Sequence, residues 1–372
     1  MADIKIPTEL LPVDGRFGCG PSRVRQAQID AFAQHGAKLM GTSHRQAPVK
    51  NLVKRVQEGL MDLYHNPEGY EIVIGDGGST AFWDVAAFSL AEGKAQALVH
   101  GEFGGKFANA LKAPWLTAPT VINGTPGSRL ELQAEAGVSL YAYAQNETST
   151  GVVTPVKRIA GVDEGALFLT DATSAAGGID FDPTETDVYY FAPQKNFASD
   201  GGLWFALMSP AAIERAERVA GSGRYIPEFL SLKTAIDNSR LNQTLNTPAI
   251  ATLFLLAEQV DWMNGNGGLS WADSRTRAAS DHLYNWADNS SFATPFVENP
   301  EHRSQVVVTI DFNEGIDAAA IAKVLRANGV VDTEPYRKLG RNQLRIATFT
   351  AVDLEDVQQL TKCIDYVVGQ LG

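Results

Sequence analysis

The sequence predicts an α/β fold with a mainly parallel sheet, followed by a smaller α+β unit. Three observations support this prediction. The chain of 372 residues is long enough for one large core and a second, smaller one. Between residues 71 and 208, short apolar runs alternate with stretches of helical periodicity, as is typical of parallel sheets. After the break Asn264-Gly-Asn-Gly-Gly268, the order changes to helix, strand, helix, strand, helix.

The overall charge and composition argue against several classes of protein. A formal net charge of -12 and a pI near 5.0 provide no general basic field for nucleic acid or an anionic membrane. No run of about 18 apolar residues occurs, and the first residues lack the charged start and apolar stretch of a signal peptide. The two cysteines, Cys19 and Cys363, lie far apart without metal-site spacing, which favours a reducing compartment. We therefore expect a cytoplasmic protein with no metal, membrane or nucleic-acid site.

The N-terminal part of the chain is expected to begin with an extended arm. Residues 8–22 are rich in proline and glycine, and Ser22 is the expected N-cap of a following helix. A second helix is expected over residues 49–65, with Pro48 in its first turn. With the break at residues 264–268 as a boundary, the expected division is an arm (1–15), a large unit (16–263) and a small unit (264–372).

The large unit is expected to alternate strands and helices. Its predicted strands cover residues 71–75, 96–100, 138–144, 166–171, 188–192 and 203–208, and helices start near residues 80 and 105. A helix over residues 210–219 precedes a long irregular stretch, 220–246, of a kind that is often functional or intersubunit. Thr247 and Pro248 then predict the N-cap and first turn of a helix that reaches residue 262. The small unit is expected to have strands at 306–312 and 344–347 and helices at 318–328 and 354–368.

A lysine lies on the turn between the last two strands of the large unit. Lys195 follows the apolar run 188–192 and precedes the run 203–208, so its amine is held at the rim of the sheet. A partly desolvated amine loses its proton more readily and can attack a carbonyl carbon to form a Schiff base. The same local pattern also fits a solvated turn lysine, and the turn alone does not separate the two.

Two other strand ends carry polar groups, and ligands of open α/β sheets bind at the carboxyl ends of the strands. The strand 71–75 ends in Gly75-Asp-Gly-Gly-Ser-Thr80, and the helix N-terminus that follows favours a phosphate. This turn departs from the dinucleotide pattern G-x-G-x-x-G, and it also fits a plain structural turn. Asp171 closes the strand 166–171, either as a cap of the next segment or as the partner of a cation.

Taken together, Lys195, Asp171 and the glycine-rich turn favour one cofactor. Pyridoxal phosphate requires a lysine for its aldehyde, an acid for its pyridine nitrogen and a helix N-terminus for its phosphate. The sequence predicts all three at one edge of the same sheet.

Seven short motifs occur along the chain: Gly20-Pro-Ser22, Ser43-His-Arg45, Asn146-Glu-Thr148, Asp171-Ala-Thr-Ser174, Gln194-Lys-Asn196, Asn246-Thr-Pro248 and Leu344-Arg345. In this order they resemble the phosphoserine aminotransferase family of fold-type I pyridoxal-phosphate enzymes, over nearly the whole chain. The resemblance implies a homodimer that interconverts O-phosphoserine and 2-oxoglutarate with 3-phosphohydroxypyruvate and glutamate, in serine biosynthesis. A second activity on 4-phosphohydroxythreonine stays open.

The resemblance also implies roles in cofactor binding. Lys195 binds the aldehyde and moves the proton during transfer, and Asp171 pairs with the ring nitrogen. The remaining residues expected to contact the cofactor are Gly78, Ser79, Thr80 and Gln194 at the phosphate, Phe103 on the ring, Thr148 near the phenolic oxygen, and Asn246 and Thr247 at the partner subunit's cofactor phosphate.

Two positions depart from the familiar bacterial enzyme. Ser79 and Thr80 stand where that enzyme has Ala-Arg, so phosphate binding is expected to rely more on hydroxyl and backbone groups. Phe103 stands where it has Trp, which keeps an aromatic surface. In these positions the chain resembles an actinobacterial branch of the family.

Substrate binding requires cations, because phosphoserine and glutamate each carry two anionic groups. The resemblance assigns the α-carboxylate to Arg345, and the distal phosphate or side-chain carboxylate to His44 and Arg45. Arg337, Lys338 and Arg341 form a basic run, from which we choose Arg341 as a further phosphate ligand. A solvated basic turn fits this run as well.

Three other functions fit part of the pattern. An alanine–glyoxylate aminotransferase shares the fold, but its small neutral substrates need no cluster of His44, Arg45 and Arg341. A cysteine desulfurase needs a nucleophilic cysteine on a mobile loop, whereas Cys19 and Cys363 lie in the arm and in a predicted terminal helix. A phosphate-binding module without covalent chemistry would use only the turn 75–80.

Overall fold

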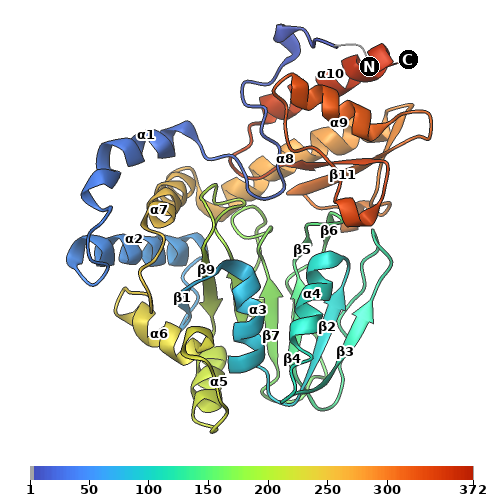
Figure 1. Ribbon diagram of the computed structural model, residues 1–372. Coiled ribbons are helices and arrows are strands. Elements are labelled where there is room, and N and C mark those ends of the chain that lie inside the picture. Colours follow the sequence, from blue (N-terminus) through green and yellow to red (C-terminus); the bar gives the residue numbers. More distant parts are fainter. Residues whose placement is uncertain (1–3, 372) are drawn as a thin grey trace.

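The computed structural model describes residues 4–371 and contains a seven-stranded sheet in the order β1-β9-β8-β7-β4-β2-β3 (Figure 1). Its strands are β1 (Glu71–Asp76), β2 (Lys94–Val99), β3 (Thr117–Asn123), β4 (Val138–Ala144), β7 (Leu167–Asp171), β8 (Val188–Phe191) and β9 (Leu203–Met208). The pairs β3/β2, β2/β4, β4/β7 and β7/β8 are parallel, whereas β9 is antiparallel to both β8 and β1. The predicted α/β fold with a mainly parallel sheet is confirmed.

Helices cover both faces of this sheet, so most of its strands are buried apolar runs. One face packs against α2 (Ala47–Leu63) and α7 (Ile250–Gly265). The other packs against α3 (Gly78–Ser89), α4 (Glu102–Ala110), α5 (Pro210–Ala220) and α6 (Leu232–Arg240). Because side chains alternate along a strand, Tyr189 of β8 joins the first core and Tyr190 joins the second. A further helix, α1 (Gln26–His35), packs on α7.

The strand directions bring five loops to one edge of the sheet. The strands β2, β4, β7 and β8 run in one direction, and β1 shares it because β9 is antiparallel to both of its neighbours. The carboxyl ends of these five strands therefore meet at the same edge. The segments that leave this edge begin at residues 77, 100, 145, 172 and 192, which are the segments in which the sequence places its candidate cofactor residues.

A second core lies in the C-terminal part of the chain. The helices α8 (Gly268–Asp288), α9 (Ala318–Ala327) and α10 (Leu354–Leu371) pack around an antiparallel sheet of β10 (Ala293–Pro295), β11 (Val307–Phe312) and β12 (Gln343–Ala347). A short ribbon of β5 (Asn146–Glu147) and β6 (Val152–Val153) lies beside it (Figure 1). The α7–α8 junction coincides with the expected boundary, and the division into two units stays a prediction.

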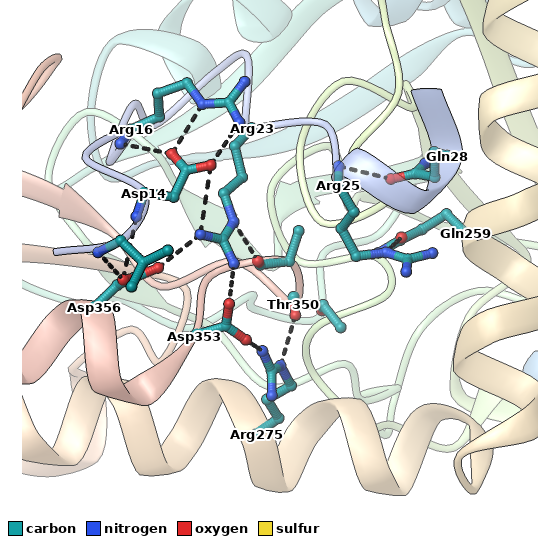
Figure 2. A network of polar contacts seen from close by, with 12 residues as sticks. Asp14, Arg16, Arg23, Arg25, Gln28, Gln259, Arg275, Thr350, Asp353 and Asp356 are labelled. Carbon is teal, nitrogen blue, oxygen red and sulfur yellow. Dashed lines mark hydrogen bonds and ion pairs between the residues drawn. The ribbon is translucent and has the colours of Figure 1, made fainter. Parts of the chain in front are cut away.

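The N-terminal segment is anchored to the C-terminal core by a buried arginine. Figure 2 shows the Arg23 guanidinium among the carboxylates of Asp14, Asp353 and Asp356. Arg23 Nη1 lies 2.7 Å from Asp356 Oδ2, and Arg23 Nε donates to the Ala351 carbonyl at 2.5 Å. Asp356 is itself buried, so removal of Arg23 would leave a buried carboxylate without its cation. This pair fixes the path of the segment just before it, residues 19–22, which reaches the sheet edge.

Several local predictions were wrong at helix ends. The helix expected after Ser22 begins at Gln26, because residues 22–25 stay extended and the Ser22 N–H donates to the Gln194 carbonyl at 2.7 Å. The helix expected from Thr247 begins at Ile250. The Thr247 hydroxyl does not cap this helix and lies 3.1 Å from His44 Nδ1.

The prediction that residues 220–246 are irregular is wrong. This stretch contains α6, whose N-terminus is capped by the Ser231 hydroxyl, which accepts from the Thr234 N–H at 3.2 Å. Leu232 and Ile236 provide most of the buried apolar surface of this helix, which is too little for a clear sequence pattern. The edge strand β3 was missed because most of its side chains are exposed or half-buried.

Helices within residues 4–371 are not both long and apolar enough to cross a membrane. In the same range, His, Cys, Asp and Glu side chains form no group of three that could hold a metal ion.

Candidate active site

A cavity of about 470 Å³ opens at the edge where the five loops meet. The predicted residues that line it are Gly78, Ser79, Thr80, Phe103, Thr148, Asp171, Gln194, Lys195 and Arg345. The segment 19–21, Trp83, Asn146, Ser174 and Tyr336 are among the other residues that line it. Sheet topology thus brings Gly78 and Lys195 together, and Arg345 joins them from β12.

Lys195 follows β8 and its amine is removed from water. The side chain is 7% exposed, and burial lowers its pKa from 10.5 to about 8. Its Nζ donates to Thr148 Oγ1 at 2.8 Å and lies 5.4 Å from the centre of the Phe103 ring. A Cβ on Gly20, whose φ is +137°, would lie 2.9 Å from Lys195 Cε, so the glycine lets the arm close against the lysine. At pH 8 about half of the amine is therefore neutral and able to act as a nucleophile.

Asp171 closes β7 and is held rigidly by its neighbours. Its Oδ2 accepts from Tyr190 OH at 2.6 Å and from Trp83 Nε1 at 3.2 Å. Its Oδ1 accepts from the Thr173 N–H at 2.9 Å and from the Thr173 hydroxyl at 2.5 Å. Burial, together with the charge of Asp171, raises the pKa of Tyr190 well above its ordinary value, so the phenol keeps its proton and donates. The carboxylate is positioned to pair with a cation in the cavity.

The glycine-rich turn between β1 and α3 forms one end of the cavity. Gly77 and Gly78 have φ angles of +103° and +71°, which favour glycine and bring the backbone of the first helical turn to the cavity wall. The first N–H groups of an α-helix have no partner inside the helix and attract anions. The Ser79 hydroxyl lies 2.7 Å from that of Thr173, so it also joins the turn to the Asp171 loop.

Phe103 and Tyr336 form an aromatic wall opposite the turn. Glu147 is buried and accepts from the N–H groups of Phe103 at 3.3 Å and Gly104 at 2.9 Å, which fixes the start of α4. The Phe103 and Tyr336 ring centres are 5.9 Å apart. The carboxyl-terminal segment that carries Tyr336 is joined to α4 by the ion pair between Lys338 and Glu102.

Arg345 brings a cation into the cavity from β12. Its Nη1 donates to the Thr148 carbonyl at 3.0 Å, and its guanidinium lies 5.4 Å from the centre of the Tyr336 ring. Its Nε is buried and has no hydrogen-bond partner within residues 4–371. An unpaired buried donor on an arginine is suited to a carboxylate ligand.

Four other predicted residues form a cluster that does not line this cavity. His44, Arg45, Asn246 and Thr247 lie together, with Thr247 Oγ1 3.1 Å from His44 Nδ1 and Arg45 Nη2 donating to the Leu245 carbonyl at 3.1 Å. We call these four residues the 44–247 cluster. Burial, together with the charge of Arg45, lowers the pKa of His44. Arg45 and both Asn246 and Thr247 are exposed.

The 44–247 cluster is held beside the glycine-rich turn by Asp76, the last residue of β1. Asp76 accepts a hydrogen bond from the Asn246 N–H, and burial raises the pKa of its carboxyl to about 6. The cluster is therefore fixed to the same sheet edge, but its residues do not line the chain's own cavity.

The basic run 337–341 is not gathered at the cavity. Arg341 pairs with Asp311, with its Nε 3.0 Å from Asp311 Oδ2, and its guanidinium lies 4.5 Å from the centre of the Phe296 ring. Lys338 pairs with Glu102. Neither residue reaches Lys195 in the chain described here, and the assignment of Arg341 to the substrate phosphate stays a prediction.

Sequence reasoning missed several residues that line or support the site. Trp83 lies one helical turn after Ser79, and this i, i+4 spacing could have placed both on the same side of α3. Thr173 and Ser174 were within a noted motif, but Thr173 meets Ser79 of α3, and Ser174 meets Asn146 and Thr148, which periodicity does not reveal. Tyr336 had no local signal, because its role depends on the packing of the C-terminal core against α4. Cys19 was discounted as part of the arm, yet it lines the cavity.

Comparison with known proteins gives the family. The family model for aminotransferase class-V matches residues 19–333. The chain belongs to the class-V aminotransferases. Phosphoserine aminotransferase of Nocardioides sp. is 61% identical to this aminotransferase over 99% of both chains, which places it in the phosphoserine aminotransferase family.

Solved structures agree on the fold. The phosphoserine aminotransferase of Cytophaga hutchinsonii has a TM-score of 0.87 at 22% identity and covers 95% of this aminotransferase and 99% of its own chain. The PLP-bound phosphoserine aminotransferase of Trichomonas vaginalis has a TM-score of 0.82 at 18% identity, covering 95% and 99%. The alanine–glyoxylate aminotransferase of Nostoc sp. also reaches a TM-score of 0.78 at 19% identity, covering 98% and 97%. The predicted fold-type I class is confirmed, and the fold is shared with enzymes of other names.

The residues of the cavity fit pyridoxal phosphate, the predicted cofactor, which the class-V family supports. Lys195 is available for the aldehyde, and Asp171 for the ring nitrogen. Gln194 lines the cavity together with Gly78, Ser79 and Thr80 of the first turn of α3, where backbone N–H groups and hydroxyls would donate to a phosphate. The aromatic face of Phe103 is on the cavity wall.

The depressed pKa of Lys195 predicts a stability change with pH in the cofactor-free protein. The difference between pKa 10.5 in the unfolded chain and about 8 in the folded chain corresponds to about 3 kcal/mol. This destabilisation is fully present below pH 8 and disappears as the pH rises to 10.5. We expect Lys195→Met to be more stable than the unchanged protein at pH 7, and this advantage to shrink by about 2–3 kcal/mol at pH 10, as measured by urea unfolding.

Lys338→Met is the control for this experiment. Glu102 raises the pKa of Lys338 above its ordinary 10.5, so its ammonium stays charged at both pH values and the effect of the substitution should not change. An advantage of Lys195→Met that is the same at pH 7 and pH 10 would contradict the assigned burial of the amine.

Proposed function

We propose that this protein interconverts O-phosphoserine and 2-oxoglutarate with 3-phosphohydroxypyruvate and glutamate, as a step of serine biosynthesis. The observation that carries the proposal is the 61% identity to a phosphoserine aminotransferase over 99% of both chains. The cavity supports it, because a buried lysine, a fixed aspartate and an arginine line the same space. A second activity on 4-phosphohydroxythreonine stays open, and the cytoplasmic location stays a prediction.

The roles of the two catalytic residues follow from their surroundings. Bound pyridoxal phosphate carries the amino group and accepts electrons from the substrate carbon. Lys195 has a pKa of about 8, so near neutral pH it can both accept and return a proton at Nζ. Asp171 keeps a fixed orientation through four hydrogen bonds and is suited to hold a proton on the ring nitrogen.

Substrate binding is divided between Arg345 and a second cation. We assign the α-carboxylate, which all substrates share, to Arg345 Nε and Nη2, since Nη1 is already engaged by the Thr148 carbonyl. The phosphate of phosphoserine then needs another basic group. In the chain described here His44 and Arg45 do not line the cavity, so we propose that the 44–247 cluster of a partner subunit completes each cavity in a homodimer.

The rival functions are less consistent with the structure. A desulfurase needs a reactive thiolate, but burial raises the pKa of Cys19, and it raises that of Cys363 to about 11. A phosphate-binding module would not need a buried lysine beside a fixed aspartate. The alanine–glyoxylate type shares the fold, so only substrate preference separates it from the proposed function.

Substrate preference is tested by one half-reaction. Conversion of the bound cofactor to its amine form, followed by absorbance, should be fast with phosphoserine and glutamate and slow with alanine and aspartate. Arg45→Ala should reduce kcat/KM for phosphoserine by about 10- to 100-fold while changing that for alanine little, since it removes a charged hydrogen bond to the phosphate. Arg345→Met should reduce kcat/KM for both phosphoserine and alanine, because both carry the α-carboxylate.

Arg341→Ala provides the comparison. If Arg341 also binds the phosphate, Arg341→Ala should lower kcat/KM for phosphoserine and change that for alanine little, as Arg45→Ala does. An equal decrease for phosphoserine and alanine would show that Arg341 does not bind the phosphate. A protein that prefers alanine would contradict the proposed function.

A mixing experiment tests the contribution of the partner subunit. Arg45→Ala lacks the phosphate cation and Lys195→Ala lacks the reactive amine, so each variant alone should be nearly inactive with phosphoserine. In hybrid dimers, one cavity combines an intact Lys195 with the partner's intact Arg45. Mixing the two variants under conditions that exchange subunits should restore up to about one quarter of the normal activity, from random pairing of two chains. If Arg45 served its own chain's cavity, mixing would restore nothing.

A further inference from the structure

Ser174 lies at the inner end of a hydrogen-bond chain that starts at the reactive amine. Lys195 Nζ donates to Thr148 Oγ1 at 2.8 Å, and Thr148 Oγ1 donates to Ser174 Oγ at 2.8 Å. The Asn146 side-chain amide also donates to Ser174 Oγ at 2.8 Å, and Ser174 Oγ donates to the Asn146 carbonyl at 3.1 Å. None of the four side chains is more than 7% exposed. These groups lie on the inner wall of the cavity with little exposed surface, so their hydrogen bonds to one another are favoured.

The number of protons at Ser174 fixes the direction of the Thr148 hydroxyl. A serine hydroxyl has one proton and can accept two hydrogen bonds. The Ser174 hydroxyl donates its proton to the Asn146 backbone carbonyl. The Asn146 side-chain amide donates to Ser174 Oγ and occupies one of its two accepting positions. If that amide were turned over, its oxygen would take the Ser174 proton instead. With the Ser174 proton engaged by Asn146, the proton of the Thr148–Ser174 contact comes from Thr148, which donates to Ser174.

This direction has a consequence for Lys195. With its own proton engaged by Ser174, the Thr148 hydroxyl can only accept from the amine. One N–H of Lys195 therefore points at Thr148, and the nitrogen lone pair of the neutral amine cannot point there. It is directed to another side of the cavity, where an aldehyde carbon can be attacked.

We propose that Ser174 is a positioning residue that holds the Thr148 hydroxyl as a hydrogen-bond acceptor for the Lys195 amine. The inference rests on the proposed role of Lys195 as the lysine that binds the cofactor aldehyde. It adds to that role a requirement on a residue that touches neither the amine nor the substrate arginine. It also means that Thr148 must leave Ser174 before it can donate to a cofactor oxygen.

The test measures the titration of Lys195 in the cofactor-free protein. The rate at which Lys195 reacts with acetic anhydride, read by mass spectrometry of its peptide, should rise with pH around a midpoint near 8. In Ser174→Ala the Thr148 proton becomes free to point at the amine nitrogen, which favours the neutral form. We expect the midpoint to fall by about 0.5–1 pH unit, the value of one hydrogen bond.

A double substitution separates this relay from a general structural effect. Thr148→Val should lower the midpoint as well, and adding Ser174→Ala to Thr148→Val should change it no further, because Ser174 acts only through Thr148. Ser280→Ala removes an equally buried serine hydroxyl, which donates to the Arg277 carbonyl of α8, and should leave the midpoint unchanged. A midpoint that stays near 8 in Ser174→Ala, or that falls further in the double variant than in Thr148→Val, would overturn the proposal.

A pair of isosteric variants keeps the test decisive if Ser174→Ala does not fold. Ser174→Thr and Ser174→Val add the same bulk, and only threonine retains the hydroxyl. The proposal expects the threonine variant to have a midpoint about 0.5–1 pH unit above that of the valine variant; equal midpoints would contradict it. Failure of the proposed function gives a different result, since a Lys195 midpoint above 10 in the unchanged protein would remove the reactive amine itself.

Discussion

The amine of Lys195 is removed from water by parts of the chain that are far apart in the sequence, and this desolvation controls its chemistry. Gly20 of the arm closes against its side chain, Phe103 of α4 covers one side, and Thr148 accepts its hydrogen bond. Burial is the largest cause and lowers the pKa, and the charge of Arg345 lowers it further, whereas the nearby charge of Asp171 raises it. The result is an amine that is partly neutral near physiological pH, as a nucleophile and proton carrier requires.

One sheet provides most of this site because its strands share a direction. The carboxyl ends of β1, β2, β4, β7 and β8 meet at one edge, so the glycine-rich turn, Phe103, Thr148, Asp171 and Lys195 each lie at or just after the end of a strand. The remaining parts come from outside the sheet. Arg345 is brought by β12, and residues 19–21 are held in place because Arg23 is anchored to Asp353 and Asp356 beside α10 (Figure 2). The C-terminal core is therefore connected to the cavity from two sides.

The sequence was sufficient for the parts of the site that depend on strand order. Lys195, Asp171 and the turn 77–80 each follow a buried apolar strand, and parallel pairing places them together. It was insufficient where side chains from different segments meet. Tyr336 and Ser174 gain their roles from packing, and Thr247 does not cap its helix because its hydroxyl meets His44. Thr148 was found through a family motif, but the direction of its hydroxyl depends on buried partners that periodicity does not reveal. The family of the chain could be inferred from its motifs, whereas the finding that the 44–247 cluster does not line the chain's own cavity required coordinates.

Borohydride trapping is the most direct test of Lys195 as the residue that binds the cofactor aldehyde. The protein loaded with pyridoxal phosphate would be reduced, digested and examined by peptide mass spectrometry, with Lys195→Met treated in parallel. We expect loss of the visible absorbance band and one pyridoxyl adduct, on the peptide that contains Lys195, with none in the variant. An adduct on another lysine, or transaminase activity that survives in Lys195→Met at the normal rate, would contradict this role of Lys195.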